Sequence, residues 1–165
     1  MAALESIDVF CHFLPPKYCR AVEEAANSPL WMFRRAQQIE VMVDLQARLA
    51  LMRQFAGYRQ IICLASPPVE KLAPNHSVRL ARLANDELAA AAAASSDAIC
   101  GFVASLPLND VAESLEETGR AIEELGAVGV QIFTHAQGLP LDDPRFEPLF
   151  AQMAEYDLPM LVHPT

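Results

Sequence analysis

The sequence is short of positive charge. Its 165 residues include 12 lysines and arginines against 21 aspartates and glutamates, which gives a formal net charge of −9. Nucleic acids and anionic membrane surfaces are bound by clustered cations, so we expect neither as a partner. The sequence also lacks any run of 18 apolar residues, and its N-terminus has no basic stretch ahead of an apolar one. It therefore predicts no membrane span and no export signal, and we expect a cytoplasmic protein.

A disulfide framework is also missing. The four cysteines, of which three fall inside apparent strands, show no regular spacing; they are Cys11, Cys19, Cys63 and Cys100. Small secreted domains that depend on disulfides have denser and more regular cysteine patterns. We therefore expect buried free thiols in a reducing compartment.

Apolar residues, in contrast, are abundant. They make up 53% of the chain, and its mean hydropathy is +0.18. Five short apolar runs begin near residues 7, 59, 99, 128 and 158, and a helical segment separates each run from the next. This alternation predicts right-handed βαβ units and a parallel sheet whose strands are covered on both faces.

The spacing of the later runs indicates one particular architecture. Strand–helix units of about thirty residues are typical of a (β/α)8 barrel, which needs about 250 residues in total. This chain supplies five strands of eight and ends three residues after the fifth. We therefore expect an incomplete (β/α)8 TIM barrel, in which residues 1–165 form a single domain truncated after the fifth strand.

The helical segments have recognisable ends. Gly57 follows one of them in the position of a left-handed cap, and Asn75 and Asp142-Asp143 are placed to cap others. Trp31 and Phe33 lie in the long insertion between the first two strands, where they either pack against the barrel or form a wall of a pocket. The predicted helices are Tyr18–Ala26, Leu30–Ala56, Ser77–Ser95, Val111–Leu125 and Pro144–Tyr156.

Three histidines follow predicted strands. His12 ends the first strand, His135 the fourth and His163 the fifth. The functional groups of a (β/α)8 barrel lie at the C-terminal ends of its strands. We therefore expect His12 and His163 to lie close together at one end of the sheet.

The first strand presents half of a metal-binding pattern. Side chains two apart on a strand share a face, so Asp8, Phe10 and His12 are expected on one face and Cys11 on the other. A His-x-His strand end would direct two imidazoles to one point, as a divalent ion requires. Phe10 stands at the first of these positions and has no donor atom. Cys11 would replace the missing ligand only if a β-bulge turned it.

Several segments resemble a known family. The opening IDVFCHFLPP is similar to the start of the amidohydrolase-related family that includes aminocarboxymuconate-semialdehyde decarboxylase and γ-resorcylate decarboxylase. Members of that family typically open with Asp-x-His-x-His or Glu-x-His, followed by Phe-Leu/Phe-Pro. The resemblance continues in the same order through LASPP, LANDELA, GFVASLPLND, GVQIFTHAQGLPLDDPRFEPLF and LPMLVHP.

The resemblance implies a metal-dependent carboxy-lyase or hydrolase acting on a small carboxylated substrate. It implies His12 and His163 as ligands of Zn²⁺ or Mn²⁺, with one ion at most because the fourth strand has no lysine to bridge two. Phe10 and His135 are then expected to line the substrate pocket. The family's strand-six histidine and strand-eight aspartate have no counterpart in this chain, so no catalytic residue is assigned.

Two hypotheses remain open. In the first, the chain is the N-terminal portion of such an enzyme and is inactive alone. In the second, it is a degenerate relative without metal or catalysis, which serves as an interaction module or is a gene remnant. Phe10 favours the second, because truncation alone would not remove a ligand. Under either hypothesis an open barrel is expected to self-associate or to pair with the missing part.

Overall fold

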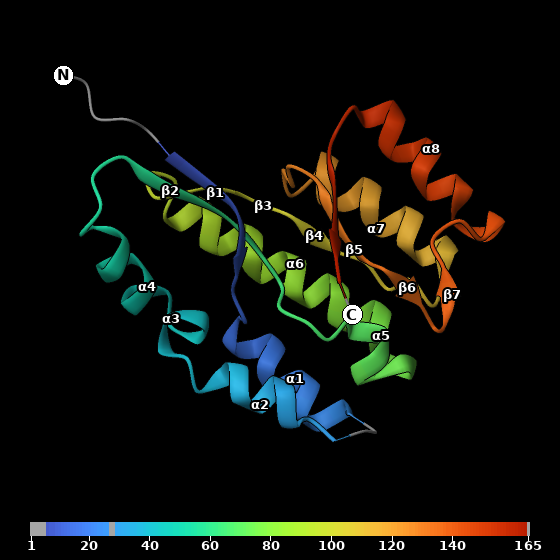
Figure 1. Cartoon of the computed structure of the whole chain (residues 1–165), viewed down its shortest axis with the longest axis horizontal. Coiled ribbons are helices and arrows are strands. Elements are labelled where there is room, and N and C mark those ends of the chain that lie inside the picture. Colours follow the sequence, from blue (N-terminus) through green and yellow to red (C-terminus); the bar gives the residue numbers. More distant parts are fainter. Residues whose placement is uncertain (1–5, 27–28, 165) are drawn as a thin grey trace.

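The computed structural model describes residues 6–26 and 29–164, which form an α/β structure of alternating strands and helices (Figure 1). Its strands are β1 (Ser6–His12), β2 (Tyr58–Cys63), β3 (Ile99–Phe102), β4 (Ala104–Ser105), β5 (Val130–Phe133), β6 (His135–Ala136), β7 (Leu139–Pro140) and β8 (Met160–His163). Its helices are α1 (Pro16–Ala25), α2 (Trp31–Gln37), α3 (Glu40–Val43), α4 (Leu45–Met52), α5 (Val69–Leu72), η1 (Pro74–His76), α6 (Ser77–Ala94), α7 (Val111–Glu123), η2 (Pro144–Phe146) and α8 (Glu147–Tyr156). None of the described helices is long and apolar enough to cross a membrane.

Six of the described strands form two three-stranded parallel sheets, ordered β1-β2-β3 and β4-β5-β8, and β6 and β7 form a short antiparallel pair. Only Val103 separates β3 from β4, and there the chain changes its hydrogen-bond partner. The Val103 amide donates to the Ile62 carbonyl of β2 at 2.8 Å, whereas the Ala104 amide donates to the Gly129 carbonyl beside β5 at 3.0 Å. The expected parallel alternation is therefore observed, with the third predicted strand divided into β3 and β4.

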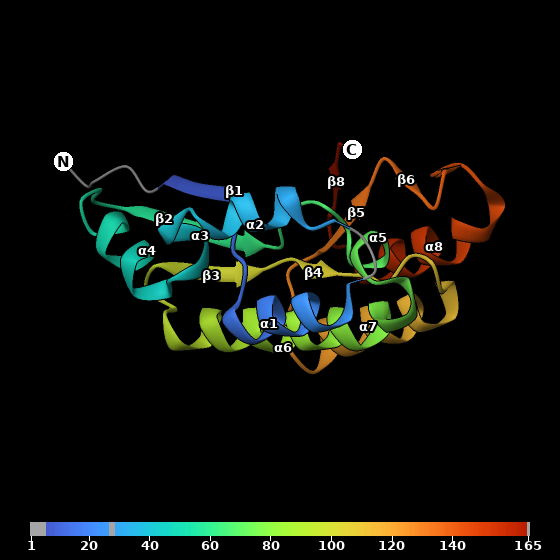
Figure 2. The same cartoon turned by 90° about the horizontal axis from the view of Figure 1, so that it is seen from below.

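The sheet curls strongly. Five strand positions span four spacings of about 4.8 Å, so the first and last strands of a flat sheet would lie about 19 Å apart. Instead, the imidazole rings of His12 on β1 and His163 on β8 have centroids 5.2 Å apart. This curvature is that of part of a barrel. Helices α1, α6 and α7 lie along one side of the strands (Figure 2).

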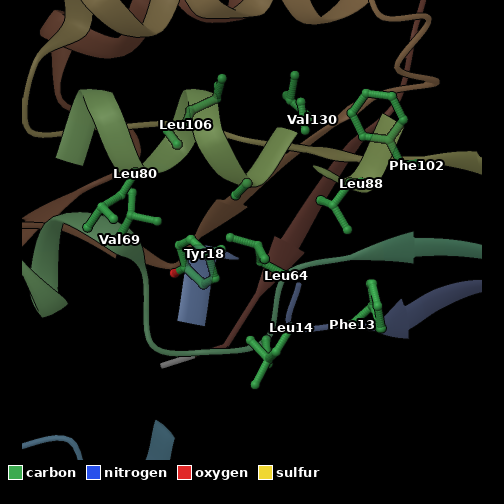
Figure 3. Close-up of a cluster of buried hydrophobic side chains, with 14 of the residues drawn as sticks. Phe13, Leu14, Tyr18, Leu64, Val69, Leu80, Leu88, Phe102, Leu106 and Val130 are labelled. Carbon is green, nitrogen blue, oxygen red and sulfur yellow. The ribbon is translucent and has the colours of Figure 1, made fainter. Parts of the chain in front are cut away.

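The core fills the space between α6 and the strands. Leu80 and Leu88 of α6 are fully buried beside Phe102 and Leu64, and Tyr18 of α1 lies in the middle of this cluster (Figure 3). The alanine-rich face of α6 allows this close approach, because small side chains leave the helix backbone near the sheet. Phe33 is 1% exposed and packs edge-on against Tyr18, so it is a core residue rather than a pocket wall, whereas Trp31 is 68% exposed.

A buried polar clamp joins α6, α7 and β4. The Asn85 amide donates to the Ser105 carbonyl at 3.0 Å and accepts from the Ser105 amide at 2.8 Å. Asn85 also donates to the carboxylate of Glu117, which Arg120 neutralises at 2.7 Å. Asn85 and Glu117 are both fully buried. The clamp therefore satisfies the main-chain groups of β4 on the edge where no strand pairs with it.

Two local expectations were wrong. The predicted helix Leu30–Ala56 is broken into α2, α3 and α4, because Ile39 and Asp44 have extended backbones and the Asp44 carboxylate caps α4 by accepting from Gln46 N at 2.7 Å. Asn75 does not cap α6: it lies inside η1, and His76 occupies the cap position without a side-chain bond.

In the loop after β5, Gln137 and Gly138 have positive φ angles and close the β6–β7 hairpin.

Candidate functional site

The first strand contains a β-bulge that changes which side chains share a face. Asp8 pairs with Gln60 and Cys11 with Ile62, so β1 has one extra residue between these pairs. The Asp8 carboxylate accepts hydrogen bonds from the Phe10 amide and from the Tyr58 hydroxyl. These bonds, the Phe10 amide first, lower the pKa of Asp8, and the Cys11 thiol adds to the effect. We expected Asp8 on the same face of the strand as Phe10 and His12. The bulge instead places it on the same face as Cys11.

Four rings gather where β1, β5 and β8 end. The centroid of Phe10 is 5.0 Å from His12 and 5.5 Å from His163. His163 is also 5.2 Å from Phe133 of β5, with which it pairs across the strands. The expected meeting of His12 and His163, with Phe10 on the same face, is confirmed. We call these four residues the ring cluster.

The tautomer of His12 is fixed by its surroundings. Its Nδ1 lies 2.9 Å from the Leu64 carbonyl, which can only accept, so Nδ1 holds the proton and Nε2 keeps a lone pair. Burial is the main effect that lowers the pKa of His12, followed by the neighbouring His163. Both effects favour the neutral imidazole, which is the form that binds a metal ion.

His163 has a similar arrangement. Its Nδ1 lies 2.7 Å from the Pro164 carbonyl, so Nδ1 carries a proton and, in the neutral ring, Nε2 has the lone pair. Metal-binding histidines in proteins commonly donate their second nitrogen to a carbonyl in this way. With metal–nitrogen bonds of about 2.0–2.1 Å, two imidazoles on one tetrahedral ion have centroids about 5 Å apart. The 5.2 Å between His12 and His163 is compatible with that spacing.

Arg48 holds the main chain at the end of β1. Its guanidinium donates to the His12 carbonyl, to Gln60 Oε1 at 2.6 Å and to the Val41 carbonyl at 2.9 Å, and it lies over the Phe13 ring at 5.6 Å. Arg48 is only 6% exposed. One side chain from the insertion thus connects α3, β2 and the residue that bears the imidazole.

These donors are an incomplete metal site. A catalytic zinc ion usually has three protein ligands, and the ring cluster offers two nitrogens because Phe10 has no donor. Cys11 does not complete the set despite the bulge: it is 7% exposed, burial raises the pKa of its thiol to about 12, and it lies with Asp8. Within residues 6–26 and 29–164, no group of three or more histidine, cysteine, aspartate or glutamate side chains is placed to hold a metal ion.

Two further residues bear on the site. His135 lies in β6, two residues beyond Phe133, and is exposed; its assignment to the substrate pocket stays a prediction. Gln131 of β5 was missed by the sequence analysis. It is 1% exposed, and its Nε2 donates at 3.2 Å to the Leu64 carbonyl that also accepts from His12. A glutamine in an otherwise apolar strand was the only sequence signal for it.

Comparison with known proteins settles the family. The family model described as Amidohydrolase matches residues 7–165. The chain belongs to the amidohydrolase family. This amidohydrolase chain is 33% identical over 134 residues to the γ-resorcylate decarboxylase of Rhodococcus jostii, which covers 74% of the chain and 40% of that protein. It is also 33% identical over 163 residues to a 6-methylsalicylic acid decarboxylase of Aspergillus aculeatus, covering 96% of the chain and 47% of that protein.

Solved structures of amidohydrolases share the fold. The 5-carboxyvanillate decarboxylase of Novosphingobium aromaticivorans, complexed with manganese and a nitrobenzoic acid, superposes with a TM-score of 0.79 at 29% identity, covering 99% of the chain and 51% of that protein. The 2,6-dihydroxybenzoate decarboxylase of Rhizobium gives a TM-score of 0.78 at 27% identity, covering 98% and 50%. The chain spans about half the length of the relatives it matches.

Proposed function

We propose that this chain forms the N-terminal part of a metal-dependent, nonoxidative decarboxylase that acts on a small aromatic carboxylate. The proposal rests mainly on the paired His12 and His163 imidazoles, each of which directs Nδ1 at a main-chain carbonyl. The chain's relatives include decarboxylases, and solved neighbours contain manganese. Within the protein, His12 and His163 are proposed as two ligands of one divalent ion, manganese or zinc.

The chemistry explains why these groups belong together. Nonoxidative decarboxylation replaces a carboxylate by a proton at carbon and releases CO2. A bound divalent ion supplies charge that polarises a substrate oxygen. The residues of this chain have the other tasks: His12 and His163 present their Nε2 nitrogens, and the partly exposed Phe10 offers a flat apolar face against which an aromatic ring can lie. Phe10 and His135 are proposed to line the substrate pocket.

The chain alone is proposed to be inactive. Its ring cluster supplies two nitrogens, and its other residues supply no third ligand in the described structure. The proposed activity therefore needs groups from the second half of the barrel, which relatives of twice the length possess. We further propose that residues 1–165 form a single domain of a cytoplasmic protein. Its proposed partner is the complementary part of the barrel.

Manganese binding tests the proposal directly. Titration of the purified chain with Mn²⁺, followed by the electron paramagnetic resonance signal of the free ion, should show weak binding. Replacement of both His12 and His163 by alanine should abolish it, whereas His76→Ala, at an exposed position in η1, should leave it unchanged. Equal binding by the double variant and the wild-type chain would refute the assignment of these two ligands.

A second candidate function follows from Phe10. Its ring lies where the family pattern has a histidine, within 5.5 Å of both imidazoles, and contributes no donor. This favours a non-catalytic family member that keeps the fold for interaction with another protein. The two candidates differ in a decarboxylase assay with Mn²⁺ and 2,6-dihydroxybenzoate on the chain joined to the second half of a related decarboxylase. CO2 release supports the enzyme, and a folded, inactive product supports the interaction module.

A further inference from the structure

The Leu64 carbonyl accepts hydrogen bonds that link three strands. Leu64 directly follows β2, outside any regular element. Its oxygen accepts from His12 Nδ1 at the end of β1, at 2.9 Å, and from Gln131 Nε2 on β5, at 3.2 Å. A carbonyl oxygen has two lone pairs, so these two side chains can occupy both.

The Gln131 side chain is held by its hydrogen bond to the Leu64 carbonyl. Its side chain is 1% exposed, and its Oε1 is buried without a partner among the described residues. The bond to Leu64 is therefore the one that holds the amide. Gln131 shares its strand face with Phe133, two residues on, which contacts His163. Gln131 thus reaches from the strand beside one imidazole to the acceptor of the other.

We infer that Gln131 is a positioning residue for the candidate metal site, acting on His12 through the Leu64 carbonyl. The inference rests on the proposed function, because it gives His12 the role of a ligand. With Gln131 in place, the Leu64 peptide plane is fixed from two sides. The His12 ring is then held with Nδ1–H directed at the carbonyl and with Nε2 in one orientation, ready for an ion.

Loss of the Gln131 donor should leave the orientation of the His12 ring less fixed without creating a cavity in the core. Gln131→Met keeps the length and volume of the side chain and removes both the donor and the unpaired oxygen, so the fold should survive. The Leu64 peptide can then rotate, and the His12 ring can exchange between its tautomers. Outer partners of metal ligands typically change affinity about 10- to 100-fold when they are removed.

The matched control is Gln152 of α8. Its Nε2 also donates to a main-chain carbonyl, that of Leu115 at 3.1 Å, and its Oε1 is also buried without a partner in the described structure. It differs from Gln131 in lying on a helix away from the ring cluster. Gln152→Met therefore removes the same chemistry at a site with no connection to His12.

The experiment records the ring nitrogens of His12 by ¹⁵N NMR in metal-free protein at pH 8. We expect one Nδ1–H tautomer in the wild-type chain and in Gln152→Met, and averaged nitrogen shifts in Gln131→Met. Gln131→Asn keeps an amide but shortens its reach, so it should behave like Gln131→Met and provides a second variant if the first does not fold. Unchanged His12 shifts in the folded Gln131 variants would overturn the inference.

Manganese affinity separates this inference from the proposed function. If the wild-type chain binds Mn²⁺, Gln131→Met should weaken the binding about tenfold or more and Gln152→Met should not; equal affinity of Gln131→Met and wild type would count against a positioning role. If the wild-type chain binds no Mn²⁺, the proposed function fails. The NMR comparison in metal-free protein then still decides whether Gln131 orients His12.

Discussion

Phe10 is the residue that most limits the chemistry of this chain. Its ring completes a triangle with two imidazoles, at 5.0 Å from His12 and 5.5 Å from His163. The two histidines direct Nδ1 at carbonyls, as metal-binding histidines commonly do, and a third nitrogen is missing at the Phe10 corner. A single substitution therefore separates a two-nitrogen site from a three-nitrogen one.

Phe10→His should raise the affinity of the chain for Mn²⁺ by about tenfold or more, because a third imidazole at this corner adds a ligand. Isothermal titration calorimetry of the two proteins measures the change. Phe55→His, at an exposed ring far along the chain, is the control and should have no effect. A Phe10→His variant that binds no more tightly than the wild type would show that the corner does not face the Nε2 atoms.

Glu70 of α5 is a second residue with a measurable consequence. It is 4% exposed, and neither of its carboxylate oxygens has a partner among the described residues. Burial raises the pKa of Glu70 from 4.5 to about 7. A pKa that is higher in the folded than in the unfolded chain means that the folded state binds the extra proton. Stability from this group is therefore present below pH 4.5 and is lost as the pH rises to about 7.

Glu70→Gln should abolish this loss. The difference in unfolding free energy between variant and wild type should grow from pH 4.5 to pH 8 by up to about 3 kcal/mol, in favour of the variant. Urea denaturation at several pH values gives the difference. Glu24→Gln, at an exposed site on α1, is the matched control. Parallel curves for Glu70→Gln and wild type would mean that folding does not raise the pKa of Glu70.

At the scale of elements, strand order and the convergence of His12 and His163 were predictable from the sequence. Both follow from local patterns, namely apolar runs, strand alternation and the rule that barrel sites lie at strand ends. The bulge after Asp8 was not predictable, because it is stabilised by Tyr58, fifty residues away. The same holds for the bond of Arg48 to the His12 carbonyl and for that of Gln131 to the Leu64 carbonyl, which join residues 36 and 67 positions apart.

The Asn85 clamp should be the most sensitive polar contact between elements. Asn85→Leu leaves the Ser105 amide and carbonyl and the Glu117 carboxylate without their buried partner. The unfolding free energy should fall by about 3 kcal/mol or more, since three buried groups lose a partner and each unsatisfied group costs about 1–3 kcal/mol. Chemical denaturation measures the loss. Asn109→Leu removes an exposed bond to Pro74 and should cost less than about 1 kcal/mol. Similar losses for both variants would contradict the clamp.

For the whole molecule, the edges of the two outer strands are expected to determine whether the chain associates in solution. In the described structure β1 pairs only with β2, and β8 only with β5, so each leaves one edge unpaired. Ile7 and Val9 on β1 and Val162 on β8 are each about half exposed. Unpaired edges with apolar side chains are surfaces on which chains associate.

The chain should therefore self-associate at micromolar concentration, or bind the complementary half of a barrel when one is supplied. Size-exclusion chromatography with light scattering should show a mass above 18.1 kDa. Val9→Lys should shift the mass towards the monomer, because an edge lysine opposes strand pairing. Met32→Lys, on the exposed side of α2, should not. A monodisperse wild-type monomer would show that the edges are protected in some other way.

The contact between Asn85 and Ser105 also bears on how this fold tolerates changes of length. The Asn85 side-chain amide on α6 supplies the donor and the acceptor that a neighbouring strand would otherwise offer to β4. An inserted residue between Ser77 and Asn85 would rotate the amide by about 100° around the helix axis and break both bonds. An insertion after Ala94 would leave them intact. Insertions and deletions in evolution or engineering should therefore be accepted after this helix and rejected within its first half.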